Sequence, residues 1–161
     1  MKYSVLLLAL FAIVFGFSSC QKDDELLPTQ LEGVWEERIF VDSLDYWVVN
    51  TIDFDRNGTY QARTTVRDSE GGPDLGYRFY FDTKYDWDTK ILTYFPNEGY
   101  FLNTNEFYTP KAELVLAIMC YFRQPKAQLT FSADGKTMNY LEIFEFDINF
   151  EPHVANYIRV R

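Results

Sequence analysis

The sequence has few of the residue types on which most active sites and metal centres depend. Its 161 residues include two cysteines, Cys20 and Cys120, and one histidine, His153. If Cys20 is modified, no internal disulfide can form, and the fold must be held by an apolar core. Cys120 lies in an apolar run and is predicted to be a small buried hydrophobe. Nucleophilic catalysis lacks its usual residues, so we expect no enzyme, no cofactor and no metal.

Positive charge is also scarce. Lys and Arg number 15 against 24 Asp and Glu, which gives a formal net charge of -9 at pH 7. Nucleic-acid binding needs basic surfaces that neutralise phosphates, and adhesion to anionic lipid also needs basic residues. The charge balance therefore argues against a nucleic-acid partner and indicates a well-solvated surface.

No apolar run is long enough to cross a bilayer. The longest, Leu6–Phe17, is about a dozen residues, whereas a transmembrane helix needs about 20. Lys2 precedes this run, and the small residues Ser18 and Ser19 follow it. A charged start, a short apolar run and small residues at its end are typical of a secretory signal. We expect residues 1–19 to be removed as a signal peptide.

The residues around the expected cleavage site resemble the lipobox of bacterial lipoproteins. Phe17-Ser18-Ser19 precedes Cys20, and Phe17 departs from the Leu usual at its position. The resemblance implies that Cys20 becomes the diacylated first residue, with 20–30 as a tether to the membrane. Two or three acyl chains give the stable attachment that one chain does not. The other interpretation is an ordinary signal peptide followed by an accidental cysteine.

The residues after Cys20 indicate the membrane to which the mature protein is expected to be exported. Gln21 is not the Asp that typically retains lipoproteins in the inner membrane. Together Gln21, Lys22, Asp23 and Asp24 resemble the export signal of surface lipoproteins in some Gram-negative bacteria. A solvated polar linker is the alternative. The resemblance implies attachment to the outer membrane, with exposure on the cell surface as a further expectation.

The rest of the chain is predicted to be β-structure. Apolar and polar residues alternate in 46–55 and in 59–66. The Asn57-Gly58 pair between them is a hairpin signal, because it readily adopts positive φ. Two further hairpins are predicted around 88–90 and 133–135. The other expected strands are 36–41, 77–82, 85–87, 91–95, 127–131, 137–146 and 157–160, with turns at 68–73 and 96–99.

The stretch 109–123 has two interpretations. Thr109-Pro110 suits the start of a helix, whereas the β-branched and aromatic residues that follow suit a strand. We favour a strand and keep one short helix near 110–122 as the alternative. Eight to ten short strands with regular turns predict an all-β fold, a single antiparallel up-and-down barrel.

Several short motifs resemble those of lipocalin-like lipoproteins of Gram-negative bacteria. Gly33-x-Trp35 is similar to the G-x-W signature of lipocalins, and Tyr157-Ile158-Arg159 matches the end of the domain. Between them lie Ile52-x-Phe54-x-x-x-Gly58-x-Tyr60, Tyr85-x-Trp87 and the 129–136 motif. The resemblance implies one barrel domain over 31–161, with Trp35 at its closed end and Arg159 over the indole.

Aromatic residues are abundant, with 12 Tyr and 15 Phe. In a barrel, inward aromatics either fill the core or line a pocket for an apolar ligand; we favour filling and keep both. Trp47, Tyr80, Trp87 and Tyr100 are the candidates for ligand contact. The leading hypothesis is a lipid-anchored, non-enzymatic binding module for a small apolar ligand.

Two other classes of function stay open. Exposed aromatic residues would suit a surface protein that binds a protein partner or a glycan. The closely spaced Asp82, Asp86 and Asp88 would suit a hydrolase, since glycosidases pair carboxylates, although polar strand ends explain them more simply. Asp53-x-Asp55-x-Asn57 begins like a calcium loop but lacks the acidic twelfth residue, and turn chemistry accounts for it.

The anchor makes a prediction about the mature N-terminus. Mass spectrometry of protein extracted from membranes should find Cys20 as the first residue, with its mass increased by the attached acyl chains. An unmodified terminus downstream of Cys20 would show that the chain is not a lipoprotein.

Overall fold

Ten strands and one turn of 3-10 helix make up the described chain. The computed structural model describes residues 30–103, 105–119, 124–143 and 154–161. The predicted signal peptide, Cys20 and the export signal lie outside these residues, as do Cys120 and His153. The elements are β1 (Gly33–Val41), β2 (Tyr46–Phe54), β3 (Thr59–Arg67), β4 (Gly76–Asp88), β5 (Ile91–Tyr94), β6 (Glu98–Phe101), η1 (Lys111–Glu113), β7 (Val115–Ile118), β8 (Lys126–Phe131), β9 (Thr137–Ile143) and β10 (Val154–Arg159).

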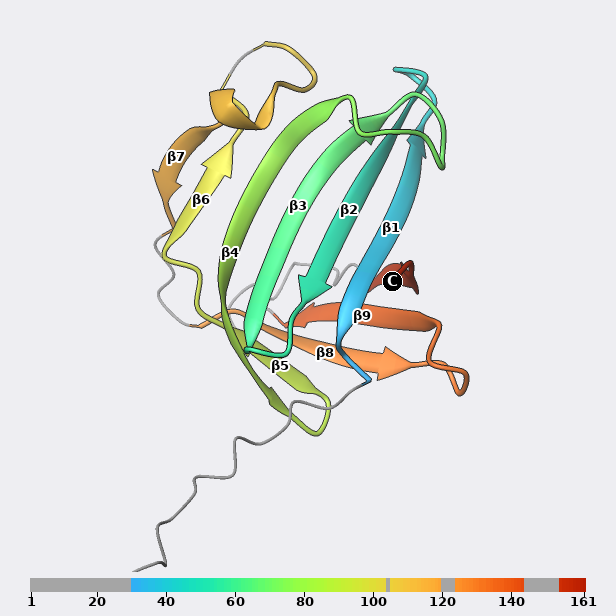
Figure 1. Ribbon diagram of the computed structural model, residues 1–161, viewed down its shortest axis with the longest axis vertical. Helices are drawn as coiled ribbons and strands as arrows, with labels where there is room; N and C mark the ends of the chain where they lie inside the picture. The colour runs from blue at the N-terminus through green and yellow to red at the C-terminus, as the bar shows by residue number, and fades with distance from the viewer. Residues whose placement is uncertain (1–29, 104, 120–123, 144–153) are drawn as a thin grey trace, which may run out of the picture.

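The strands close into an antiparallel barrel (Figure 1). Hydrogen-bonded neighbours follow the order β3-β2-β1-β10-β9-β8-β5-β4, and the pairing of β3 with β4 completes a ring of eight. β6 and β7 continue the sheet from β4 outside this ring. The predicted all-β antiparallel barrel is confirmed, with two strands beyond those that close.

Two of the predicted hairpins form at glycine turns. Gly58 joins β2 to β3 with φ of 74°, and Gly135 joins β8 to β9 with φ of 67°. Positive φ costs glycine little because it has no Cβ. At the first turn the Asp55 carboxylate accepts a hydrogen bond from the backbone N–H of Asn57 at 2.5 Å. This turn contact accounts for the acidic residue that begins like a calcium loop.

β4 is longer than predicted and has two partners on one edge. The sequence predicted 77–82 and 85–87 as separate strands, but the ladder with β3 continues through Thr83 and Lys84. On its other edge β4 pairs first with β6 and then, from Tyr85 onward, with β5. The predicted turn at 96–99 is wrong in its second half, because Glu98 and Gly99 pair with β7.

The ambiguous stretch 109–123 contains both predicted kinds of structure. Lys111–Glu113 forms η1, and Val115–Ile118 forms β7 against the free edge of β6. The Thr109 hydroxyl donates to the Glu113 carboxylate at 2.7 Å, which ties the two ends of the turn together. No helix among the described residues has the length and apolar character needed to cross a membrane.

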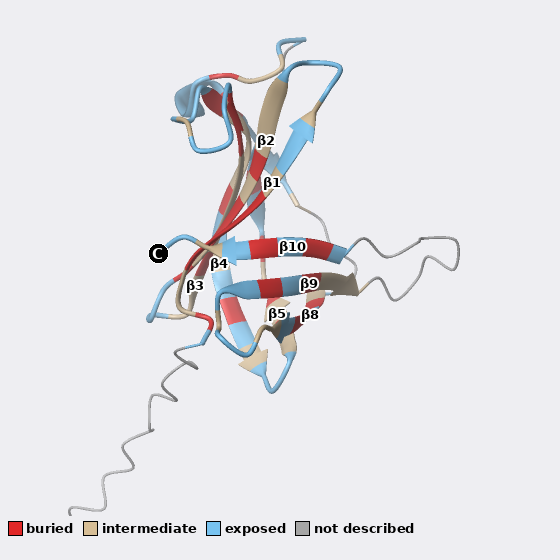
Figure 2. Cartoon of the chain, turned by 90° about the vertical axis from the view of Figure 1, so that its right-hand side faces the viewer, coloured by how far each residue is buried: buried red, intermediate tan, exposed pale blue. Residues whose placement is uncertain are grey.

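One end of the barrel is packed with apolar side chains. Trp35, Phe54, Leu92, Leu129 and Met138 are at most 1% exposed, and we call this region the closed end. Figure 2 shows buried segments on the strands around it. The indole N–H of Trp35 donates to the Leu31 carbonyl at 2.9 Å, so its polar atom is satisfied inside the core. Each such side chain contributes roughly 1.5–3 kcal/mol by leaving water.

A polar network covers the outer side of β1 and β3. The Arg67 guanidinium donates to Glu36 at 2.8 Å and to Asp74 at 2.7 Å, and Arg38 donates to Glu36 at 2.7 Å. Burial raises the pKa of Glu36, but the hydrogen bonds from Arg67 and Arg38 outweigh it and leave the pKa lowered. Glu36 is therefore ionised at neutral pH and helps to hold the β3–β4 loop, through Asp74, against the barrel.

Gly33→Ala should destabilise the protein. Gly33 has φ of 121°, and a Cβ there would overlap the carbonyl oxygen of Arg161. That oxygen also accepts a hydrogen bond from Val34 at 2.9 Å, so the seam between the chain ends would have to move. We expect urea denaturation to show a loss of about 2–3 kcal/mol in the free energy of unfolding.

Gly71→Ala is the matched control, because no described atom lies within 4 Å of a Cβ added there. Its free energy of unfolding should change by no more than about 0.5 kcal/mol. Equal losses in the two variants would contradict this account of Gly33.

Candidate functional site

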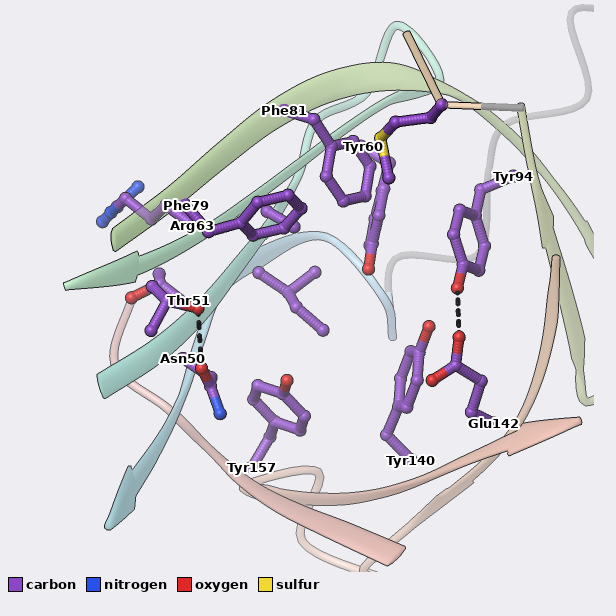
Figure 3. A pocket seen from close by; sticks show the side chains of 14 residues that line it. Asn50, Thr51, Tyr60, Arg63, Phe79, Phe81, Tyr94, Tyr140, Glu142 and Tyr157 are labelled. Carbon is purple, nitrogen blue, oxygen red and sulfur yellow. Dashed lines mark hydrogen bonds between the residues drawn. The ribbon is translucent and has the colours of Figure 1, made fainter. Parts of the chain in front are cut away.

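A cavity of about 250 Å³ lies in the barrel interior, beyond the closed end (Figure 3). Its walls come from six strands of the ring, β2, β3, β4, β5, β9 and β10, and from Met119, which follows β7. Apolar, aromatic and polar groups all contribute. The described lining residues are Asn50, Thr51, Ile52, Tyr60, Ala62, Arg63, Thr64, Phe79, Phe81, Tyr94, Met119, Tyr140, Glu142 and Tyr157.

Strand alternation explains why these residues meet. Successive side chains point to opposite faces of a strand, so Tyr60, Ala62 and Thr64 of β3 share the inner face. Tyr140 and Glu142 of β9 likewise lie two residues apart. Figure 3 shows Tyr140 and Tyr157 pointing from one side of the cavity toward Tyr60 and Phe79 on the other. Closing the ring therefore gathers side chains from distant parts of the sequence.

Four buried tyrosines dominate the lining. Tyr60, Tyr94, Tyr140 and Tyr157 are 3–8% exposed. The ring centroids of Tyr60 and Tyr94 are 5.2 Å apart, and those of Tyr140 and Tyr157 are 6.0 Å apart. Burial, as the main cause, raises the pKa of all four hydroxyls above the usual value for tyrosine. The hydroxyls are therefore protonated at neutral pH and can each donate a hydrogen bond.

Glu142 provides a carboxylate beside this cluster. The Tyr94 hydroxyl donates to its Oε1 at 3.0 Å (Figure 3). Burial raises the pKa of Glu142, and the hydrogen bond from Tyr94 only partly opposes that effect. The cationic residue among the described lining residues, Arg63, directs its guanidinium away from the cavity (Figure 3).

A second polar group fixes the wall near Asn50. The Asn50 amide donates to Glu37 Oε2 at 3.0 Å, and its carbonyl oxygen accepts from the Thr64 hydroxyl at 2.9 Å. Glu37 is 8% exposed, and its Oε1 accepts from the backbone N–H of Asn156 at 3.2 Å. Because both ends of the Asn50 side chain are bonded, this part of the wall is preorganised.

The four aromatic residues proposed from the sequence are not brought together. Tyr80 and Tyr100 form one pair on β4 and β6, with ring centroids 6.1 Å apart. Trp47 packs on Phe40 of β1 instead, and Trp87 packs on Phe131 near the closed end. None of the four is among the described residues that line the cavity.

Tyr80 is already engaged by its neighbours. The Lys111 ammonium lies 3.4 Å from the centroid of its ring, and its hydroxyl accepts from the Gln61 amide at 3.1 Å. A ligand at this surface would have to displace one of these contacts.

The residues predicted at the closed end, Gly33, Trp35 and Arg159, lie together where β1 pairs with β10. Trp35 pairs with Arg159 in the β1–β10 ladder, and the Arg159 guanidinium carbon lies 4.5 Å from the centroid of the Trp35 ring. Gly33 lies two residues before Trp35 in the same strand, next to the carbonyl of Arg161.

All three proposed acids are exposed on β4. Asp82 and Asp86 line a groove of about 640 Å³ together with Glu98 and Tyr100. Asp88 ends β4 at the hairpin, where its carboxylate accepts from the Thr89 hydroxyl at 2.9 Å. Among the described residues, no group of three or more acidic, His or Cys side chains is placed to hold a metal.

Sequence reasoning missed the residues that do meet in the cavity. Tyr60 and Tyr157 belong to the motifs of the family resemblance but have no predicted role in a site, and Tyr94, Tyr140 and Glu142 are not among the predicted site residues. The i, i+2 spacing of Tyr140 and Glu142 is a usable signal, since it puts a carboxylate beside an aromatic ring on one face. Which strand faces β9 across the barrel cannot be read from that spacing.

The fold and cavity together define a class of protein: an antiparallel eight-stranded β-barrel with an internal cavity of mixed polarity. Neither a scan against protein-family models nor a search of curated proteins finds a match to the chain. The barrel and its cavity are therefore the basis for any proposal about function.

Glu142→Gln should change how stability depends on pH. Folding raises the pKa of Glu142, so the folded state favours the protonated acid. The stability contributed by this group is full below the unfolded pKa and is lost as pH rises through the folded pKa. Glutamine stays neutral and can still accept from Tyr94. Urea denaturation should find the variant more stable than wild type at high pH, with the difference shrinking as pH falls.

Glu98→Gln is the control, because Glu98 is an exposed carboxylate of the outer groove. Its curve of stability against pH should follow that of the wild type. Parallel wild-type and Glu142→Gln curves would show that Glu142 is not desolvated in the folded protein.

Proposed function

We propose that the barrel is a binding module that holds a small ligand in its interior cavity. The observation that carries this proposal is the cavity itself, lined by four tyrosines, two phenylalanines and a carboxylate. Ligand sites are typically concave and largely apolar with a few placed polar groups. At about 250 Å³, the space lies below the range of about 300–1,000 Å³ that is typical of ligand pockets. The ligand is therefore small.

The lining changes the kind of ligand expected from the sequence. Tyr94 already donates to Glu142, but a carboxylate can accept several hydrogen bonds, and a purely apolar molecule would donate none to it. A ligand with an apolar body and one polar or charged group fits both kinds of wall. We propose that this ligand is bound and released unchanged.

The resemblance to lipocalin-like lipoproteins supports a proposal about the location of this module. We propose that acyl chains on Cys20 attach the protein to the outer membrane, with 20–30 as the tether and 31–161 as the barrel domain. The packed closed end and the Gly33-x-Trp35 opening with Arg159 over the indole support the resemblance. A tethered binding module of this kind would hold its ligand at the cell envelope.

Recognition of a protein or glycan through exposed aromatics is the second candidate. Phe40 is 42% exposed beside Trp47, and Tyr100 is 37% exposed beside Tyr80. These pairs lie on different strands, β1 and β2 in one case and β4 and β6 in the other. The cavity gathers its groups in one place, and we therefore favour the interior site.

Filling the cavity tests the proposal. Ala62 lines it and pairs with Ile52 and Phe81 on the flanking strands. Ala62→Phe should place a ring in the space and weaken ligand binding at least about tenfold, a loss of about 1.4 kcal/mol. Ligand-observed NMR with neutral and charged fragments of about ten non-hydrogen atoms measures the loss.

Ala112→Phe is the matched control, since Ala112 is exposed in η1 and its variant should bind as the wild type does. Ala62→Leu adds a smaller group and keeps the test usable if the larger ring prevents folding. The proposal is wrong if no fragment distinguishes the wild type from the Ala62 variants.

A further inference from the structure

We propose that the cavity selects a small organic cation, such as an amine or a quaternary ammonium ion. This inference rests on the proposed binding function and adds the charge of the ligand. The juxtaposition that carries it is the Glu142 carboxylate beside the rings of Tyr60, Tyr94, Tyr140 and Tyr157 in the lining of one cavity.

The charged group that faces into the cavity is a carboxylate. Glu142 is in the wall, and Glu37 lies behind Asn50 at hydrogen-bonding distance. Arg63 contributes to the wall, but its guanidinium points outward (Figure 3). An opposite charge placed a few ångströms from a carboxylate is attracted far more strongly in a protein interior than in water. A ligand cation would meet that field, whereas a ligand anion would be repelled by it.

The aromatic rings favour the same ligand. A cation is attracted to the face of an aromatic ring within about 6 Å of its centroid, by roughly 0.5–2 kcal/mol. Tyr60 and Tyr94 lie on one side with Phe79 and Phe81, and Tyr140 and Tyr157 lie across the cavity from them (Figure 3). A cation at the centre would therefore have rings on opposing sides and a carboxylate at one edge.

The desolvation of Glu142 agrees with this assignment. Burial raises the pKa of Glu142, which means that the ionised carboxylate is poorly solvated where it lies. A cation would offset this penalty, and a neutral molecule of the same shape would not. The four hydroxyls keep their protons at neutral pH, so the rings stay uncharged.

A metal ion fits this cavity less well than an organic cation. Calcium takes six to eight oxygen ligands, mostly carboxylates and carbonyls. Glu142 is the carboxylate among the described lining residues, and its neighbours are phenolic. Rings and a single carboxylate instead suit a cation that carries its own apolar groups.

The test compares two probes of the same shape. Choline and 3,3-dimethylbutan-1-ol share one heavy-atom skeleton, with a charged nitrogen in the first and a neutral carbon in the second. Isothermal titration calorimetry measures the affinity for each probe. The buffer contains about 0.15 M salt, which screens nonspecific attraction of the cation to the acidic surface. We expect the full chain to bind choline about tenfold or more tightly than the neutral probe.

Substitutions test whether Glu142 in the cavity causes this preference for choline over the neutral probe. Glu142→Gln should reduce it to about threefold or less, because the amide keeps the shape and loses the charge. Glu98→Gln removes a carboxylate from the outer groove and should leave the preference unchanged. Ala62→Phe should weaken the binding of both probes.

The outcomes separate this inference from the function on which it rests. If both probes bind equally and Ala62→Phe weakens both, the cavity binds ligands but does not select cations, and the inference is wrong. If choline binds equally to wild type and Ala62→Phe, it binds outside the cavity, and the inference is again wrong. If neither probe binds, the cation selection fails, while the fragment measurement decides separately whether the cavity binds any ligand.

Discussion

The pairing of the first strand with the last is the contact on which the barrel depends. β1 meets β10 where Trp35 faces Arg159, and the ends are tied by two backbone hydrogen bonds, from Val34 to the Arg161 carbonyl at 2.9 Å and from Val160 to the Val34 carbonyl at 2.8 Å. Closure removes the free edges of both strands. It also traps the Trp35 indole between the core and the Arg159 guanidinium. The cavity exists because this seam brings β10, and with it Tyr157, opposite β3.

The two halves of the barrel interior contain different kinds of side chain. At the closed end large apolar side chains fill the space, and burial of their surface stabilises the ring. Farther along, β4 changes partner from β5 to β6, and the walls carry tyrosines, Asn50 and Glu142. Inward aromatic residues thus fill the core at the closed end and line the cavity in the other half. Filling stabilises the barrel, and the mixed lining is the basis of the proposed binding function.

Local sequence signals predicted the structure correctly where that structure forms within a single hairpin. The turns at Gly58 and Gly135 formed as predicted, because a positive φ is a property of the turn residues themselves. The errors fell where pairing with a distant segment decides the outcome. Glu98 and Gly99 became a strand through β7, and the two segments predicted within 76–88 merged because β3 supports the whole length. Of the four aromatic residues proposed for a site, Tyr80 and Tyr100 meet through the β4–β6 pairing, whereas Trp47 and Trp87 each pack on another aromatic residue.

The sequence alone determined the class of fold and the expectation of a lipid anchor in the outer membrane. Alternation, turn residues and the Gly33-x-Trp35 motif are local patterns, and local patterns are enough to predict antiparallel strands that must close or cover their edges. Tertiary structure decided the cavity. Tyr60, Tyr94, Tyr140, Glu142 and Tyr157 come from four strands spread over almost 100 residues of the chain, and only the order of strands around the ring sets which of their inner faces meet. Burial then raises the pKa of Glu142, a property that no residue has until its neighbours are in place.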